Sequence, residues 1–202
     1  MSYWTTSRAV QRRRAVDPDD IARVSVELLD GEGPRGLTVR AVAEHCGVSP
    51  SGLYSRISGA DDLFDLALDH ALGQDTQVNT QVSRDDPDLT ELLVAYFRHL
   101  AEHRWACQVL AERAPRGPNY LRVSELMCRL LENAGATDPL GTAYSLSNFV
   151  IGSALTAPMT GSERELDVDA EAAPVYARLR SAHDATAEQL LRRGLASLFP
   201  SP

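Results

Sequence analysis

Apolar residues recur along most of the chain with the 3.6-residue period of an amphipathic helix. In the first such segment Ile21, Val24 and Leu28 stand at i, i+3 and i+7, shortly after an Asp-Pro pair of the kind that starts helices. Similar patterns predict further helices over about 61–78, 89–100, 105–113, 120–133, 140–155 and 174–198. Residues 161–171 alternate acids with small residues and predict a surface loop. No segment requires strand pairing, so the expected fold is all-α.

Residues 38–57 contain two short helical patterns around a tight turn. Thr38 is a predicted N-cap, Gly47 ends the first helix, and the second begins at Pro50 and runs through Ile57. Two short helices joined in this way are typical of a helix-turn-helix. Small or polar side chains on the second helix suit the major groove of DNA. The residues predicted to face outward there are Ser49, Ser51, Gly52, Ser55 and Arg56.

The Gly47-Val48-Ser49 turn and the Leu53-Tyr54 pair are the most specific marks of a longer similarity. From Leu37 to Leu72 the chain resembles the TetR family of transcriptional regulators. The resemblance implies an N-terminal three-helix DNA-binding domain and a C-terminal helical domain that binds a ligand and dimerises. It places Arg40 near bases or phosphate, and Tyr54 on a phosphate. The resulting DNA-contact candidates in this region are Thr38, Arg40, Ser49, Ser51, Gly52, Tyr54, Ser55 and Arg56.

Two positions depart from the family pattern. Ile57 stands where an aromatic residue is common, which is a tolerable change in a core. Ala60 stands where family members commonly hold a phosphate with a lysine, so one phosphate contact is missing.

The C-terminal half carries a weaker resemblance, to the tetracycline-repressor branch, through segments 103–120, 133–135 and 148–152. Leu110 aligns with the histidine that binds magnesium in that branch, and an apolar side chain cannot hold the metal. We therefore expect a largely apolar small-molecule effector that binds without metal. The candidate ligand-binding residues are Phe97, Leu100, His103, Leu110, Arg113, Tyr120, Met127, Tyr144 and Phe149. For each of them, core packing is the alternative interpretation.

Charge is unevenly distributed over the 202 residues. The formal net charge is −8, yet residues 1–60 sum to +1 and residues 61–202 to −9, and every basic residue is arginine. Arg13 and Arg14 belong to an N-terminal arm, residues 1–16, in which four arginines precede the first acid. Such an arm can enter the minor groove beside a recognition helix, or it can be a solvated tail.

Other chemistry is less well supported. Cys46, Cys107 and Cys128 form neither a disulfide framework nor a zinc motif, and no secretion signal or membrane span stands out, which favours the cytoplasm. His99 and His103 have a metal-compatible spacing, but a helix break is expected beside them. Because no catalytic motif is present, no enzymatic activity, metal or cofactor is expected. The alternative is a helical small-molecule-binding protein or enzyme without DNA binding.

The sequence thus predicts a basic arm (1–16), a helix-turn-helix domain (17–60) and a ligand-binding and dimerisation domain (61–202). Small residues and surplus apolar positions favour a homodimer through helices at about 139–157 and 174–198. We expect a repressor that leaves a near-palindromic double-stranded operator when a small molecule shifts the helix at 61–78. Activation of transcription is the alternative, and the sequence does not decide between the two.

Overall fold

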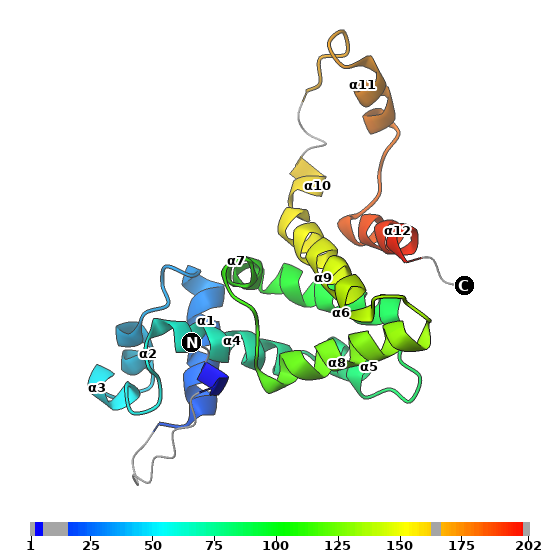
Figure 1. Ribbon diagram of the computed structural model, residues 1–202. Helices are drawn as coiled ribbons and strands as arrows, with labels where there is room; N and C mark the ends of the chain where they lie inside the picture. Colours follow the sequence, from blue (N-terminus) through cyan, green and yellow to red (C-terminus); the bar gives the residue numbers. More distant parts are fainter. Residues whose placement is uncertain (1–2, 6–15, 163–166, 200–202) are drawn as a thin grey trace.

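The computed structural model describes residues 3–5, 16–162 and 167–199, and within these ranges it contains helices and no strand (Figure 1). The all-α prediction is confirmed. The helices are η1 (Tyr3–Thr5), α1 (Pro18–Glu32), α2 (Val39–His45), α3 (Pro50–Leu53), α4 (Ala60–Gln74), α5 (Thr76–Val82), α6 (Leu89–Glu102), α7 (Arg104–Glu112), α8 (Pro118–Asn133), α9 (Pro139–Thr156), α10 (Met159–Ser162), α11 (Pro174–Ser181) and α12 (Ala187–Leu198).

The N-terminal unit is built on α1. Asp17 caps this helix by accepting a hydrogen bond from the Asp19 backbone N–H at 3.0 Å, and Gly33 ends it with a φ of 72°. That φ favours glycine, which lacks the Cβ that crowds other residues there. The apolar face of α1 packs along α4, and α2 closes the same core. Helix α4 therefore belongs physically to this unit, although it also reaches α8.

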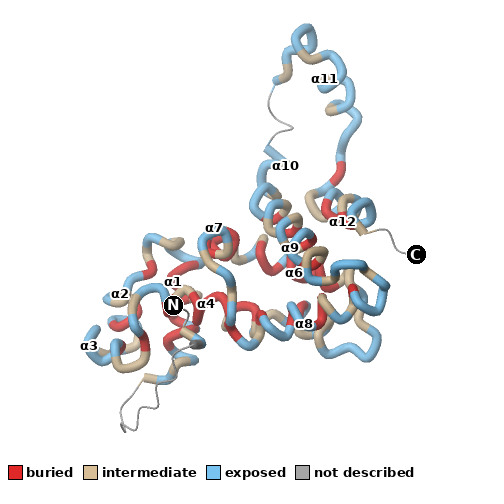
Figure 2. The backbone as a smooth tube through the Cα atoms, in the orientation of Figure 1, coloured by how far each residue is buried: buried red, intermediate tan, exposed pale blue. Residues whose placement is uncertain are grey.

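The C-terminal body surrounds α6. Leu92, Leu93 and Leu100 of this helix are fully buried, and α5, α7, α8, α9 and α12 all pack against it. Figure 2 shows the buried positions gathered along α4 and α6, with exposed residues around the outside. A helix apolar on most of its surface is expected at the centre of such a body.

The helix predicted over 61–78 is two helices. It breaks at Asp75, whose Oδ1 accepts from the backbone N–H groups of Gln77 and Val78, each at 2.9 Å. An aspartate that accepts in this way starts a new helix because it satisfies donors that lack intrahelical partners. The segment that connects the two halves of the molecule therefore ends at Gln74.

The helix predicted over 174–198 is likewise divided, into α11 and α12. Thr186 and Gln189 form a capping box that starts α12, with the Gln189 N–H 3.2 Å from Thr186 Oγ1 and the Thr186 N–H 2.8 Å from Gln189 Oε1. Helix α11 projects away from the body (Figure 1). Of the predicted loop 161–171, the first two residues complete α10, and residues 163–166 lie outside the described ranges.

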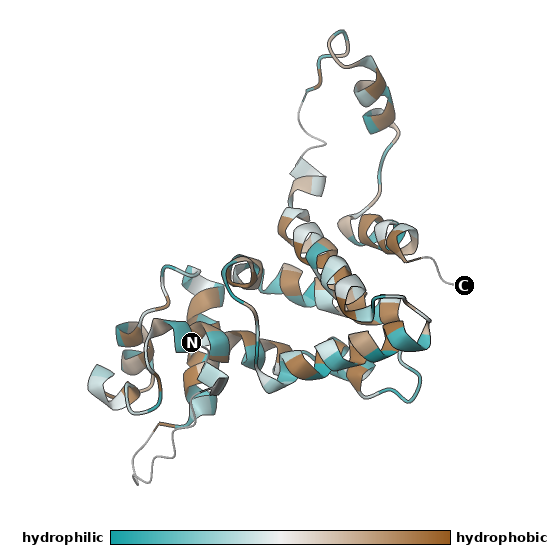
Figure 3. Cartoon of the chain, viewed as in Figure 1, coloured by the Kyte–Doolittle hydropathy of each residue, from teal (hydrophilic) through white to brown (hydrophobic). Residues whose placement is uncertain are grey.

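One face of α9 is left uncovered. Leu146 and Val150 are buried against the body, whereas Tyr144 and Leu155 on the opposite side are exposed. The sequence predicts burial on more than one face, and a single chain covers one of them. Figure 3 shows hydrophobic positions along this helix, interspersed with more polar ones.

Candidate nucleic-acid interface and its link to the C-terminal body

Helix α2 begins as the sequence predicts. The Thr38 hydroxyl accepts from the Ala41 backbone N–H at 3.1 Å, which caps the helix. Val42 and Ala43 are fully buried, whereas Arg40 is exposed. The helix is thus fixed by its apolar side and presents a cation on the other.

The turn between α2 and α3 requires its glycine. Gly47 has a φ of 67°, and the next residue, Val48, donates its backbone N–H to the carbonyl of Ala43 at 2.9 Å. Ser49 then caps α3 by accepting from the Gly52 N–H at 3.2 Å. A glycine in the left-handed region lets the chain reverse tightly enough for both helices to share one core.

The outward face of α3 agrees with the prediction in part. Helix α3 ends at Leu53, so the second helix is shorter than the predicted span to Ile57. The residues on its surface fall into two groups. Ser49, Ser51, Gly52 and Tyr54 are exposed, with Tyr54 at 50%, whereas Ser55 and Arg56 are half-buried because the chain turns back after Tyr54.

Residues 3–5 are attached to α4. The Tyr3 backbone N–H donates to Asp65 Oδ2 at 2.9 Å. Burial raises the pKa of the Tyr3 hydroxyl. The predicted DNA contacts Arg13 and Arg14 lie outside the described residues.

Three aspartates of α4 are buried, which is unusual for carboxylates. Asp62 accepts from the Ser58 N–H at 2.6 Å and so fixes the entry into the helix. Asp65 accepts from Tyr3 and from Arg113 Nη1, the latter at 3.1 Å. Each carboxylate therefore joins α4 to a different segment of the chain.

The third aspartate caps α8 from outside that helix. Asp69 is 4% exposed, and its Oδ1 accepts from the backbone N–H groups of Asn119 at 2.8 Å and Tyr120 at 3.1 Å. The N-cap residue of α8 is Gly117, which has no side chain to do this. A Cβ at that position would overlap the Asp69 carboxylate. Burial raises the pKa of Asp69, although these hydrogen bonds work in the opposite direction.

Arg113 connects the same face of α4 to the end of α7. Its guanidinium lies 2.9 Å from Asp61 Oδ1 and 3.1 Å from Asp65 Oδ1, donates to the Asp61 carbonyl at 2.8 Å, and stacks over the Phe64 ring. Sequence analysis placed Arg113 in a ligand pocket. Here the guanidinium is engaged with α4.

His103 has a comparable role. Asp30, near the end of α1, accepts from Trp105 Nε1 at 2.7 Å and lies 2.8 Å from His103 Nδ1. The junction of α6 and α7 is thereby tied to the N-terminal unit. The linking aspartates Asp30, Asp65 and Asp69 escaped sequence analysis, although an acid every fourth residue on an otherwise apolar α4 is a signal that could have revealed two of them.

The nine predicted ligand-binding residues do not gather around one cavity in the described structure. Tyr144 is 64% exposed and so is not an interior residue of the single chain. His103 lines one hollow and Arg113 a smaller one. The other seven line neither of these hollows, nor a third one beside Asp138 and Leu198. Six of those seven are packed in or against the core: Phe97, Leu100, Leu110, Tyr120, Met127 and Phe149.

The histidine pair with metal-compatible spacing is divided between two partners. His99 Nδ1 lies 3.1 Å from Asp75 Oδ2, whereas His103 faces Asp30. Cys107, four residues further, is buried near the carbonyls of Leu100 and Ile151. Within the described ranges, no helix has the length and apolar character needed to cross a membrane.

Comparison with known proteins matches two family models. Residues 21–67 match the model described as bacterial regulatory proteins, tetR family, and residues 87–192 match the tetracyclin repressor-like C-terminal domain. The second match alone spans more than half of the chain.

Several individual proteins are also similar. An HTH-type transcriptional regulator of Saccharopolyspora erythraea is 36% identical over 138 residues, which cover 67% of this chain and 58% of that protein. The class A tetracycline repressor from transposon 1721 of Escherichia coli is 29% identical, over 84% of this chain and 81% of its own length.

Solved structures share the fold. The TetR family protein ActR of Streptomyces coelicolor, in complex with (S)-DNPA, superposes with a TM-score of 0.73 at 23% identity and covers 92% of this chain and 96% of its own. The chain spans 58% of the first two curated relatives that it matches.

Proposed function

The chain belongs to the TetR family of transcriptional regulators, and from that premise we propose that it is a homodimeric repressor released from its operator by a small molecule. The observation that carries the proposal is the capped α2–turn–α3 unit, whose exposed face is small, polar and basic while its other face is buried. This unit lies in the less acidic part of the chain, so the net charge of −8 does not oppose DNA binding there.

Helix α3 would enter the major groove. Ser51 and Gly52 have the small side chains that permit close approach, Tyr54 would bond a phosphate, and Arg40 would approach a base or phosphate from α2. Thr38 and Ser49 already cap helices with their hydroxyls, and those oxygens retain hydrogen-bonding capacity toward phosphate. Arg56 is half-buried and would need a new rotamer to reach a base.

The exposed face of α9 supports the homodimer. Large apolar side chains left in water favour a protein partner, and small residues such as Gly152 allow close helix approach. We propose that α9 and α12 form the interface with a second copy, with α11 beside them. A two-fold dimer would present two recognition helices about 34–36 Å apart and would therefore read a near-palindrome.

Helix α4 supports the coupling of the two functions. Asp65 ties it to Arg113 at the end of α7, and Asp69 ties it to Asn119 in the first turn of α8, while its apolar face carries α1. A ligand that moves α7 or α8 would move α4 and change the separation of the recognition helices. The ligand needs only a difference in affinity between the two states, typically about 1–3 kcal/mol.

We propose a largely apolar effector that enters between α6 and α8 and acts without metal. Relatives include repressors named for tetracycline, and ActR is solved with (S)-DNPA. Leu110 at the position of the metal-binding histidine argues against metal-mediated tetracycline binding here. Phe97, Leu100 and Met127 line the α6–α8 core that such a ligand would open. The proposal places the protein in the cytoplasm and includes no catalytic step.

The test is release from operator DNA. The purified protein is screened against fragments from its own genomic neighbourhood by footprinting, and the protected fragment is then titrated with candidate effectors. Release by a compound that also raises the melting temperature supports the proposal. A compound that binds tightly and leaves operator affinity unchanged contradicts the induction mechanism.

A further inference from the structure

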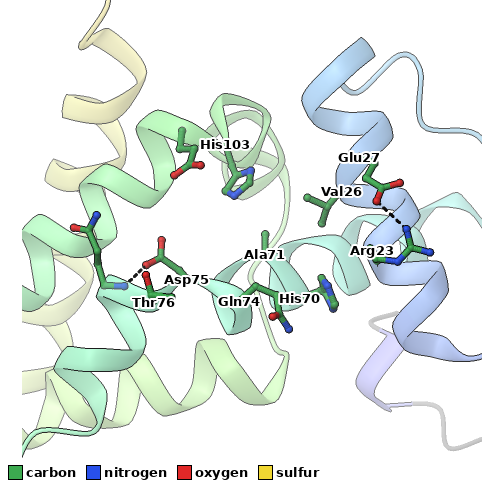
Figure 4. Close-up of a pocket in the computed structure, with 11 residues that line it drawn as sticks. Arg23, Val26, Glu27, His70, Ala71, Gln74, Asp75, Thr76 and His103 are labelled. Atoms are coloured by element: carbon green, nitrogen blue, oxygen red, sulfur yellow. Dashed lines mark hydrogen bonds and ion pairs between the residues drawn. The ribbon is translucent and has the colours of Figure 1, made fainter.

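A hollow lies between the N-terminal unit and the C-terminal body. Its volume is about 360 Å³, within the range of small-molecule sites. Figure 4 shows Arg23, Val26 and Glu27 of α1 on one side, and on the other His70, Ala71 and Gln74 of α4, with Asp75, Thr76 and His103. It is separate from the α6–α8 core proposed above for the effector.

Carboxylates outnumber cations in the lining of this hollow. Glu27, Asp75 and Glu102 face one arginine, Arg23, and that guanidinium is already bound to Glu27 Oε1 at 2.8 Å and to Asp20 Oδ1 at 3.3 Å. Glu102 has no ion pair among the described residues. With neutral histidines the lining therefore carries net negative charge.

Helix ends of both signs meet at the hollow. Helix α4 ends at Gln74 and α6 ends at Glu102, so two helix C-termini meet at the hollow. Each C-terminus is equivalent to about half a negative charge, and a carboxylate such as Glu102 is unfavourable beside one. The N-termini of α5, capped by Asp75, and of α7, which follows its N-cap His103 without a side-chain cap, lie there as well and oppose this potential. A cation in the hollow would therefore offset the charge of the carboxylates, Glu102 above all.

A buried histidine packs against two residues of the lining without lining the hollow itself. His99 is 1% exposed and is held by Asp75, and its ring centre is 5.0 Å from that of His103, so it contacts two lining residues. Its Nε2 is buried without a hydrogen-bond partner among the described residues. A buried polar group left unpaired in this way indicates a missing partner such as a water.

The lining also has apolar and aromatic surface. Val26 and Ala71 contribute alkyl groups, and the imidazoles of His70 and His103 offer flat faces. We propose that this interdomain hollow is a second ligand site and that it binds a small protonated organic amine with an apolar body. A ligand that spans it would contact α1 and α6 together, and it would stabilise the arrangement of the two units seen here.

The probe pair for a test is tryptamine, a protonated amine, and tryptophol, which replaces the amine by a neutral hydroxyl. Calorimetry with the full chain should show saturable tryptamine binding with a Kd of about 1 mM or lower. Tryptophol should bind clearly more weakly. Glu102→Gln should weaken tryptamine binding about 3- to 10-fold, as expected for one partly exposed charge. Glu125→Gln, the same change at an exposed site on α8, is the matched control and should have no effect.

A second variant tests the location without removing charge. Gln74→Trp fills the hollow from an exposed position on α4 and should abolish tryptamine binding while the melting temperature is kept. No saturable binding up to about 10 mM, equal binding of amine and alcohol, or an unaffected Glu102→Gln variant overturns the proposal. The measurement uses no DNA, so its outcome is independent of whether the chain binds an operator.

Discussion

The carboxylate of Asp69 in α4 caps α8 at Asn119, fifty residues further along the chain. Oδ1 accepts from the Asn119 backbone N–H at 2.8 Å and Oδ2 from the Asn119 side-chain amide at 2.9 Å. Most helices are capped by a residue of their own N-terminus. Here the cap belongs to the helix that carries the DNA-binding unit, so α8 cannot move along its axis without pulling on α4.

Removal of this cap should be costlier than removal of a local one. Asp69→Ala leaves the buried N–H groups of Asn119 and Tyr120 unpaired, and we expect a loss of about 2–3 kcal/mol in the free energy of unfolding. The control is Asp88→Ala, which removes the exposed cap of α6 and should cost about 1 kcal/mol. Urea denaturation measures both. Equal losses in the two variants would contradict the assignment of Asp69 as an interhelical cap.

Titration of the Asp69 carboxyl should make the stability of the protein depend on pH. Because burial raises the pKa of Asp69, the folded chain holds this proton more tightly than the unfolded chain does. Its contribution to stability is therefore greatest below the unfolded pKa of about 3.9 and declines as pH rises through the folded value. Asp69→Asn keeps the acceptor oxygen without titrating. Its stability relative to wild type should rise with pH above about 4.

Asp75 should give stability the opposite pH dependence. Although burial works against it, hydrogen bonds from His99 and from the Val78 and Gln77 N–H groups lower the pKa of Asp75. Its stabilising contribution is present above the unfolded pKa and is lost as pH falls through the folded value. The difference in the free energy of unfolding between wild type and Asp75→Asn should therefore be smallest at acidic pH. Parallel pH profiles for the two asparagine variants would refute this account.

Gly117 should not tolerate a methyl group. In Gly117→Ala the new Cβ overlaps the Asp69 carboxylate, which is buried and fixed by three donors, so we expect a loss of about 1–3 kcal/mol. Gly31→Ala is the matched control, since nothing lies within 4 Å of a Cβ there and the residue is inside α1. That variant should be neutral or gain up to about 1 kcal/mol. A tolerated Gly117→Ala would show that the approach of the two helices is looser than described.

The exposed face of α9 should control the oligomeric state. Tyr144→Glu puts a charge in the proposed interface. Because a buried unpaired charge is costly, we expect the dissociation constant of the dimer to rise at least about tenfold. Leu121→Glu changes an equally exposed apolar residue on α8 and should leave the dimer intact. Sedimentation velocity distinguishes the two. A wild-type monomer, or a Tyr144→Glu dimer, would contradict the proposed interface.

Local signals in the sequence were sufficient for the DNA-binding unit. Thr38 and Gly47 act through a hydrogen bond and a backbone angle within a few residues, and the structure has both in the predicted roles. Ser49, predicted only to face outward, is exposed and also caps α3. Helix type and period were equally local, and the all-α prediction followed from them. The predicted helix boundaries were wrong at two places. There Asp75, or the capping box at Thr186, divides a continuous apolar pattern into two helices.

Interactions between segments far apart in the chain could not be predicted from these local signals. Arg113 and His103 are polar residues at helix ends of the C-terminal body, and a place in a ligand pocket was a reasonable interpretation of each. Their partners are Asp61 and Asp65 for Arg113 and Asp30 for His103, which lie 48 to 73 positions earlier in the chain. Periodicity carries no information about such pairings. The sequence likewise does not decide whether Tyr144 faces a ligand cavity or a partner chain, because either environment favours an apolar side chain.

The central claim, that α2 and α3 read a specific DNA site, is tested most directly by footprinting promoter fragments with the wild-type chain and with Arg40→Ala. The account predicts that the wild type protects a near-palindrome. Arg40→Ala should weaken protection about tenfold or more and reduce its salt dependence, whereas Arg129→Ala on α8 should not. Failure of the wild-type chain to protect any fragment, or full protection by Arg40→Ala, would contradict the claim.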